Sequence, residues 1–184
     1  MSSLPFPLLQ STVPGALGQL YTYMQTVAAS IGQFNRPAGT IGVYLGLPIE
    51  RVEPNYLMVG NDETGELFQG YEQDWVGMPA TKPRKGEVYS IPCSVRTWCG
   101  SPGVTGGSAQ VDRMNEAFQL VNGLLEEIMA DPNGSSNGQS NLTASGSWQI
   151  KTLTNPASGP LGDEGGWGVV LELNVAVINV RING

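Results

Sequence analysis

A long amphipathic segment in the second half of the chain constrains the fold more than any other feature. Between about residues 111 and 128, apolar residues recur every three or four positions, which places them on one face of an α-helix. The segment ends at Asp131-Pro132, and Asp112 lies in its first turn, where an acidic side chain suits the helix macrodipole. The stripe that we expect to face a core consists of Val111, Met114, Ala117, Phe118, Val121, Leu124, Leu125 and Ile128.

A second helix is predicted near the N-terminus, from about residue 15 to residue 31. Pro14 stands where a first-turn proline is tolerated, and Thr12 or Ser11 can serve as the N-cap. Gly32 offers a C-terminal stop. The expected buried face consists of Leu17, Leu20, Tyr21, Met24, Val27, Ala28 and Ile31.

The remaining patterned segments predict β-strands. The run 87–98 alternates, with apolar residues on one face and polar residues on the other, which indicates a sheet with one solvated side. Pro92 cannot donate to a strand ladder, so it predicts an edge strand or a bulge. In the last run the alternation changes phase, which predicts a bulge near Val177 and Ile178. We expect strands at 41–47, 56–59, 71–76, 87–98, 148–153 and 167–182.

The order of helix, strands, helix and strands predicts an α+β fold in a single domain over residues 1–184. We expect an antiparallel sheet of strands of mixed length, with the two main helices packed on one face. The 25 Gly and 13 Pro residues favour long loops. We therefore predict an N-terminal extension at 1–13 and flexible loops at 132–147 and 155–166.

Enzymatic chemistry finds little support in the residue types present. The chain has no histidine, which removes the commonest general base and zinc ligand. The acidic pairs are sequence neighbours in turns or on a polar helix face, which is typical of solvated charge. The glycine-rich stretch 100–108 lacks the lysine of a phosphate-binding loop. The sequence predicts no catalytic, cofactor-binding or metal site.

Cysteine usage and hydropathy bound the compartment. Cys93 and Cys99 lie six residues apart on one predicted strand, too far apart for a disulfide if the strand stays extended, so we expect two free thiols. The N-terminal segment lacks a basic region, and no stretch of about 18 apolar residues occurs. We expect a reducing compartment and no membrane association.

The formal charge of −7 is concentrated in one segment. Between positions 50 and 74 the acidic residues are accompanied by a single arginine, and a short basic run follows this segment. A solvated surface explains this pattern, and so does a surface that faces a basic partner or passing DNA that must not adhere. The candidate acidic segment is Glu50, Glu53, Asp62, Glu63, Glu66, Glu72 and Asp74, and the candidate basic contact loop is Lys82, Arg84 and Lys85.

An ordered series of short motifs, from about Thr40 to the end, resembles the tail terminator proteins of long-tailed (siphovirus-type) bacteriophages, particularly those of actinobacterial hosts. The series is Val43-Tyr-Leu-Gly-Leu-Pro48, Val59-Gly60, Gln73-Asp-Trp75-Val-Gly77, Glu87, Ile91-Pro-Cys93, Gly100, Arg113, Ala117-Phe118, Asp131-Pro132 and Arg181-Ile182.

The resemblance implies a small α+β domain that assembles as a ring, usually a homohexamer. Such a ring caps the tail tube, stops tube polymerisation and presents a surface to the head–tail connector or stopper protein. It implies no active site and no cofactor; DNA passes through the lumen without specific binding. The expected location is the tail–neck region of the virion, and the host cytoplasm during assembly.

Two other interpretations stay open at this point. A head–tail stopper or neck completion protein has a similar size and fold but lies nearer the portal. A cellular binding module or small hydrolase would instead use the glycine-rich loops as the rim of a small-ligand pocket. Ring-sized particles or co-purification with tail tubes favour the virion interpretations over a ligand-binding monomer.

Overall fold

The computed structural model describes residues 11–36, 39–48, 50, 53–61, 63–76, 84–100, 106–131, 147–161 and 166–182. In chain order the elements are α1 (Val13–Ile31), β1 (Ile41–Leu45), β2 (Asn55–Val59), β3 (Gln69–Val76), β4 (Arg84–Cys99), α2 (Gly106–Ala130), β5 (Ser147–Leu161) and β6 (Gly166–Ile182). Neither described helix is long and apolar enough to cross a membrane.

The strands form one six-stranded mixed sheet in the order β1-β2-β4-β6-β5, and β3 pairs with β4 on the side that β2 also occupies. β1 and β2 run parallel, from Ile41 opposite Asn55 to Leu45 opposite Val59, and the other pairs are antiparallel. The prediction of a wholly antiparallel sheet is therefore wrong for β1 and β2. Gly46 and Pro48 mark the end of a strand, but they do not reveal that the next strand runs in the same direction as β1.

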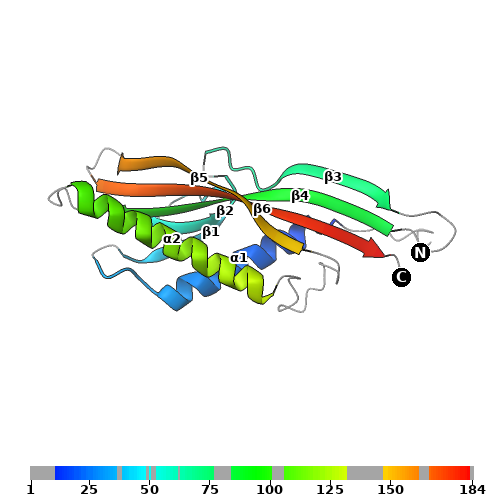
Figure 1. Cartoon of the computed structure of the whole chain (residues 1–184), viewed down its shortest axis with the longest axis horizontal. Helices are drawn as coiled ribbons and strands as arrows, with labels where there is room; N and C mark the ends of the chain where they lie inside the picture. The colour runs from blue at the N-terminus through cyan, green and yellow to red at the C-terminus, as the bar shows by residue number, and fades with distance from the viewer. Residues whose placement is uncertain are drawn as a thin grey trace.

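Both helices lie on the same side of the sheet (Figure 1), which confirms the single-domain α+β fold with two helices on one face. The helix-covered face of β4 contributes residues at every second position, as the alternation predicts. β6 does the same from Val169 to Val177. The buried strand residues of this core include Tyr89, Ile91, Cys93, Val95, Val169, Leu171, Leu173, Val175 and Val177.

The α2 stripe is only partly buried. Ala117, Leu124 and Ile128 lie in the core, as predicted. Val111, Phe118 and Leu125 are exposed, and the prediction is wrong for these three. They recur at intervals of seven residues along α2, and Phe118 and Leu125 lie on the flank of α2 that looks over β5, where no further described helix packs against α2.

The N-terminal helix begins two residues earlier than predicted. Leu20, Met24 and Val27 are buried as expected, whereas Gln19 and Tyr23 were not predicted to be buried. Gly32 ends the helix at a positive φ of 71°, a conformation that glycine adopts without strain. At the start, Thr12 is the N-cap residue, but its side chain makes no cap hydrogen bond and turns to β4 instead.

Pro92 lies in the middle of the sheet, so the prediction of an edge strand or bulge is wrong. β4 pairs without interruption with β6 along its whole length. On the other side of β4, the β2 ladder ends at Cys93 and the β3 ladder ends at Ser90. Pro92 occupies the gap between them, where its missing N–H removes no ladder bond, and its carbonyl accepts a hydrogen bond from the Gly60 N–H at 2.8 Å.

The predicted bulge near Val177 and Ile178 is also wrong, because the register of β6 against β4 is continuous. Ile178 instead lies on the solvated face of the sheet. In the ladder between β5 and β6 the register shifts on β5, between Ile150 and Thr152 and between Thr154 and Ala157.

The predicted loop 155–166 is wrong for residues 155–161, which belong to β5. Pro156 falls inside the second β5 irregularity, so it interrupts no paired position. The predicted loop 132–147 falls almost entirely outside the described residues, as does the predicted extension up to residue 10.

Candidate interaction surfaces

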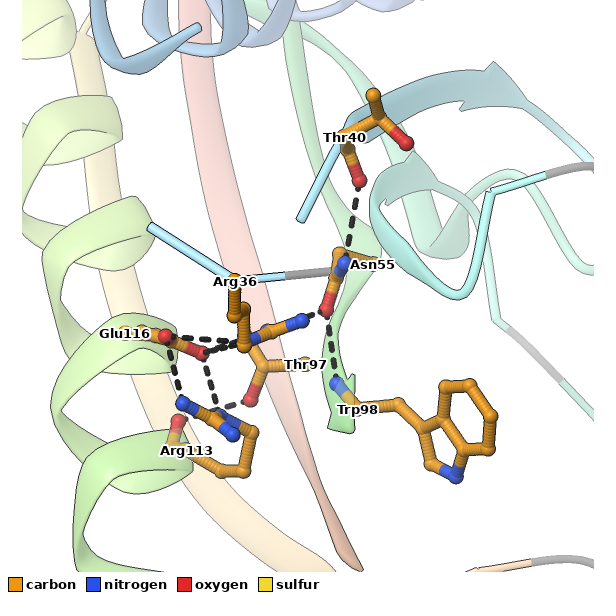
Figure 2. Close-up of polar contacts among 7 residues, drawn as sticks. All are labelled: Arg36, Thr40, Asn55, Thr97, Trp98, Arg113 and Glu116. Atoms are coloured by element: carbon orange, nitrogen blue, oxygen red, sulfur yellow. Dashed lines mark hydrogen bonds and ion pairs between the residues drawn. The ribbon is translucent and has the colours of Figure 1, made fainter. Parts of the chain in front are cut away.

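Two buried polar clusters join distant segments of the chain, and both consist of groups that already bond one another. In the first, Glu116 on α2 receives two guanidinium groups (Figure 2). Glu116 Oε2 lies 2.7 Å from Nη2 of Arg36 and 2.6 Å from Nε of Arg113. All three side chains are largely shielded from solvent, so the pairs are stronger than exposed ion pairs.

The same cluster reaches the sheet through Asn55. Arg36 Nη2 donates to the Asn55 side-chain oxygen at 2.8 Å, and that oxygen also accepts the backbone N–H of Trp98 at 2.8 Å. The Asn55 amide nitrogen donates to the Thr40 carbonyl at 3.1 Å (Figure 2). These bonds fix the segment that follows α1 against α2, β2 and β4. The arginines are thus engaged in the fold rather than presented to an anionic ligand.

The second cluster surrounds Glu87, a buried carboxylate on β4. Its Oε2 accepts hydrogen bonds from the Thr12 N–H at 2.8 Å and the Thr12 hydroxyl at 2.7 Å. Its Oε1 accepts the Tyr71 hydroxyl at 2.9 Å, and Tyr89 bonds Thr12 at 2.9 Å. A carboxylate at the start of α1 also suits the helix macrodipole. Glu87 therefore joins α1, β3 and β4.

No three acidic or cysteine side chains among the described residues come together as a metal site. Cys93 is buried, and burial raises the pKa of its thiol well above the usual range. Cys99 is half-buried, and both thiols are free. These groups do not form a catalytic constellation within the part of the chain that the structure describes.

The structure places the described members of the acidic segment along the β1–β2–β3 side of the sheet. Glu50, Glu63, Glu66 and Glu72 are exposed. Glu53 is half-buried, and its carboxylate accepts the hydroxyl of Tyr44 on β1 at 2.5 Å, so it serves the fold locally. Asp74 lies on β3, and Asp62 falls outside the described residues.

The structure describes only part of the predicted basic contact loop. Lys82 lies outside the described residues, while Arg84 and Lys85 are the first two residues of β4. The register places Lys85 opposite Arg181 on β6 and opposite Trp75 on β3. The structure thus gathers three basic positions at one end of these strands, and the sequence did not predict the arrival of Arg181.

A groove of about 590 Å³ runs between α2 and β5. Its lining is mainly apolar, and we call it the α2/β5 groove. Phe118, Leu125 and Met129 form its helical wall, and Ile150 and Leu153 form its strand wall. The three side chains of the helical wall retain between 38% and 70% of their accessible surface. Exposed apolar surface of this extent is typical of protein-contact sites.

A second exposed apolar surface lies at the opposite edge of the sheet. It consists of Leu45, Leu47, Phe68 and Tyr71, which are 37% to 49% exposed, and we call it the β1/β3 patch. The rings of Phe68 and Tyr71 meet edge to face, with centroids 6.2 Å apart. Leu47 lies close against Gly65, which brings the end of β1 beside the turn that leads into β3.

No protein-family model matches the chain, and no curated protein matches it. Among solved structures, the chain matches one described as the virion of a native gene transfer agent particle. The TM-score is 0.38 and the sequence identity is 14%, over 89% of this chain and 94% of that one.

Sequence reasoning missed both apolar surfaces. The spacing of Val111, Phe118 and Leu125 contained a signal, because residues seven positions apart form a seam of their own beside the core face. The β1/β3 patch has no such signal, since its residues come from short, separate segments.

Proposed function

We propose that the chain is a structural protein of a tailed phage-like particle and acts as its tail terminator. In this role it closes as a homohexameric ring on the finished tail tube and stops the addition of tube subunits. The other face of the ring receives the head–tail connector or stopper protein.

The observation that carries the proposal is the position of two exposed apolar surfaces at opposite edges of one sheet. A subunit with two separate contact surfaces can bind two neighbours at once, which is the requirement for a ring. The ordered series of residues that resembles tail terminators adds support. Two charged members of the series, Glu87 and Arg113, hold the fold together from buried positions, as residues of a shared scaffold would.

The charge of the chain fits a ring through which DNA passes. The formal charge of −7 repels phosphate, and described acidic residues such as Glu63, Glu66 and Glu72 are exposed. We expect the assembled protein to bind duplex DNA weakly even at low salt. Tight binding in an electrophoretic mobility assay would contradict a non-adhesive channel.

The decisive experiment examines particles made without this chain by electron microscopy. Loss of a terminator leaves tube growth unchecked, so we expect overlong tails, and expression of the intact chain in trans should restore their length. Finished tails of normal length that are not joined to heads would identify a stopper or neck protein instead. Particles of normal form would exclude both roles.

A further inference from the structure

We propose that the α2/β5 groove of one copy receives the β1/β3 patch of the next copy. The pairing is a direct contact between two surfaces of the same chain. It rests on the proposed function only in the claim that the contacts close into a ring.

The topology puts the two surfaces where such a contact needs them. β5 is one edge of the sheet, and β1 and β3 form the other. A contact between unlike surfaces of identical subunits is head-to-tail, so the two end copies of an open oligomer each keep one free surface until the ring closes. A contact between two like surfaces would stop at a dimer.

Both surfaces expose mainly apolar side chains. The groove offers a concave apolar floor between Phe118 and Leu153, and the patch offers two leucines and two aromatic rings at the sheet edge. Aromatic side chains that enter an apolar hollow are the usual anchors of protein interfaces. Neither surface has a covering element among the residues that the structure describes.

On β5 an exposed basic residue borders the groove, whereas exposed acidic residues border the patch. Lys151 is exposed on β5 next to Ile150 in the groove. It forms no ion pair with the described residues, whereas Arg36 and Arg113 both bind Glu116. Beside the patch, Glu63, Glu66 and Glu72 are exposed. A head-to-tail contact brings the lysine of one copy toward the acidic residues beside the patch of its neighbour. This attraction favours the pairing of groove with patch over a contact between two patches.

A mixing experiment tests the proposal with two variants, each of which disables one surface. Phe118→Asp places a charge in the groove, and Phe68→Asp places one on the patch; the two rings are similarly exposed. Mass measurement by light scattering at the highest soluble concentration should find oligomers for the original chain and monomers for each variant. A mixture should give a dimer that contains one copy of each variant, because one intact groove meets one intact patch.

A charge on an exposed residue away from both surfaces provides the control. Gln25 is exposed on α1, so Gln25→Asp should assemble like the original chain. Circular dichroism of all variants separates lost assembly from lost folding. Lys151→Glu should weaken assembly, most clearly at low salt, where the charges are least screened.

Several outcomes would overturn the inference. A mixture that stays monomeric contradicts the head-to-tail pairing, and normal assembly of Phe68→Asp alone identifies a contact between two grooves. An original chain that remains monomeric at the highest soluble concentration contradicts self-docking. The mixing experiment and the tail phenotype test separate claims. If particles made without this chain have overlong tails but the variants show no such interface, the terminator role stands and the interface is wrong. If the variants show the interface but the tails are of normal length, only the terminator role is wrong.

Discussion

Glu87 binds Thr12 through two hydrogen bonds, at 2.8 Å from the backbone N–H and 2.7 Å from the hydroxyl, although 75 residues separate them in the chain. The contact fixes the first turn of α1 against β4, a central strand of the sheet. Because the carboxylate is buried, it depends on the hydrogen-bond donors that surround it, and the helix N-terminus favours its negative charge. The start of α1 therefore depends on one residue of β4.

Replacement of Glu87 by Gln should destabilise the protein by about 1–3 kcal/mol, because a neutral amide accepts weaker hydrogen bonds and brings its own N–H groups toward the Thr12 donors. Urea denaturation followed by circular dichroism measures the change. The matched variant Glu72→Gln alters an exposed carboxylate on β3 and should change stability little. Equal midpoints for the two variants would contradict the anchoring role of Glu87.

Glu116→Gln should be more harmful than a change at an exposed glutamate of the same helix. The substitution removes the only carboxylate found between Arg36 and Arg113 among the described residues and leaves two shielded guanidinium groups together, at a cost of about 3–5 kcal/mol. Glu126 is exposed on α2, so Glu126→Gln is the control. Thermal unfolding compares the pair. A combined Arg36→Met and Glu116→Gln variant should recover part of the loss, because it removes one of the two guanidinium charges that Glu116 balances; an additive loss would argue against direct coupling.

The alternation of β4 and β6 was enough to predict which strand residues enter the core, because a half-buried strand exposes every second residue. Ile91 and Val95 lie where the pattern placed them. The direction of β1 against β2 was beyond such reasoning, since periodicity describes one strand at a time and not its partner. The roles of Glu87 and Arg113 were equally hidden: their bonding partners lie on other elements, and only the assembled fold brings them together.

The exposed flank of α2 also could not be predicted from the periodicity of one element. The spacing of Phe118 and Leu125 fits a helix that is apolar on one side, but the width of the covered stripe depends on what packs against it. The sheet and α1 cover the part of α2 that includes Ala117 and Leu124 and leave the flank over β5 open. A stripe that is wider than its cover in the single chain therefore leaves apolar side chains of α2 exposed to solvent.

The phenol of Tyr23 should make stability depend on alkaline pH. Burial raises its pKa well above the usual range, and its hydroxyl donates to the Asp131 carbonyl at 2.8 Å. The unfolded chain ionises this group near pH 10, whereas the folded chain keeps it protonated. Its contribution is therefore complete below about pH 10 and is lost as the pH rises further. The stability difference between the original chain and Tyr23→Phe, measured by urea denaturation, should shrink above that pH; a constant difference would contradict this assignment.

Close approach of the two helices should make one glycine indispensable and leave another free to change. A methyl group on Gly123 of α2 would meet the Val27 side chain of α1 at 2.9 Å, and a β-branched side chain in a helix has almost no alternative rotamer. Gly123→Ala should therefore destabilise the protein, although alanine favours the helix by about 1 kcal/mol. Gly18, on α1, has nothing within 4 Å of the same position, so Gly18→Ala should stabilise it by about 0.5–1 kcal/mol. Adding Val27→Ala to Gly123→Ala should relieve the clash, in part offset by the lost methyl groups of valine. Thermal unfolding of the original chain and of these three variants measures the changes. A stabilised Gly123→Ala variant would show that the helices can move apart.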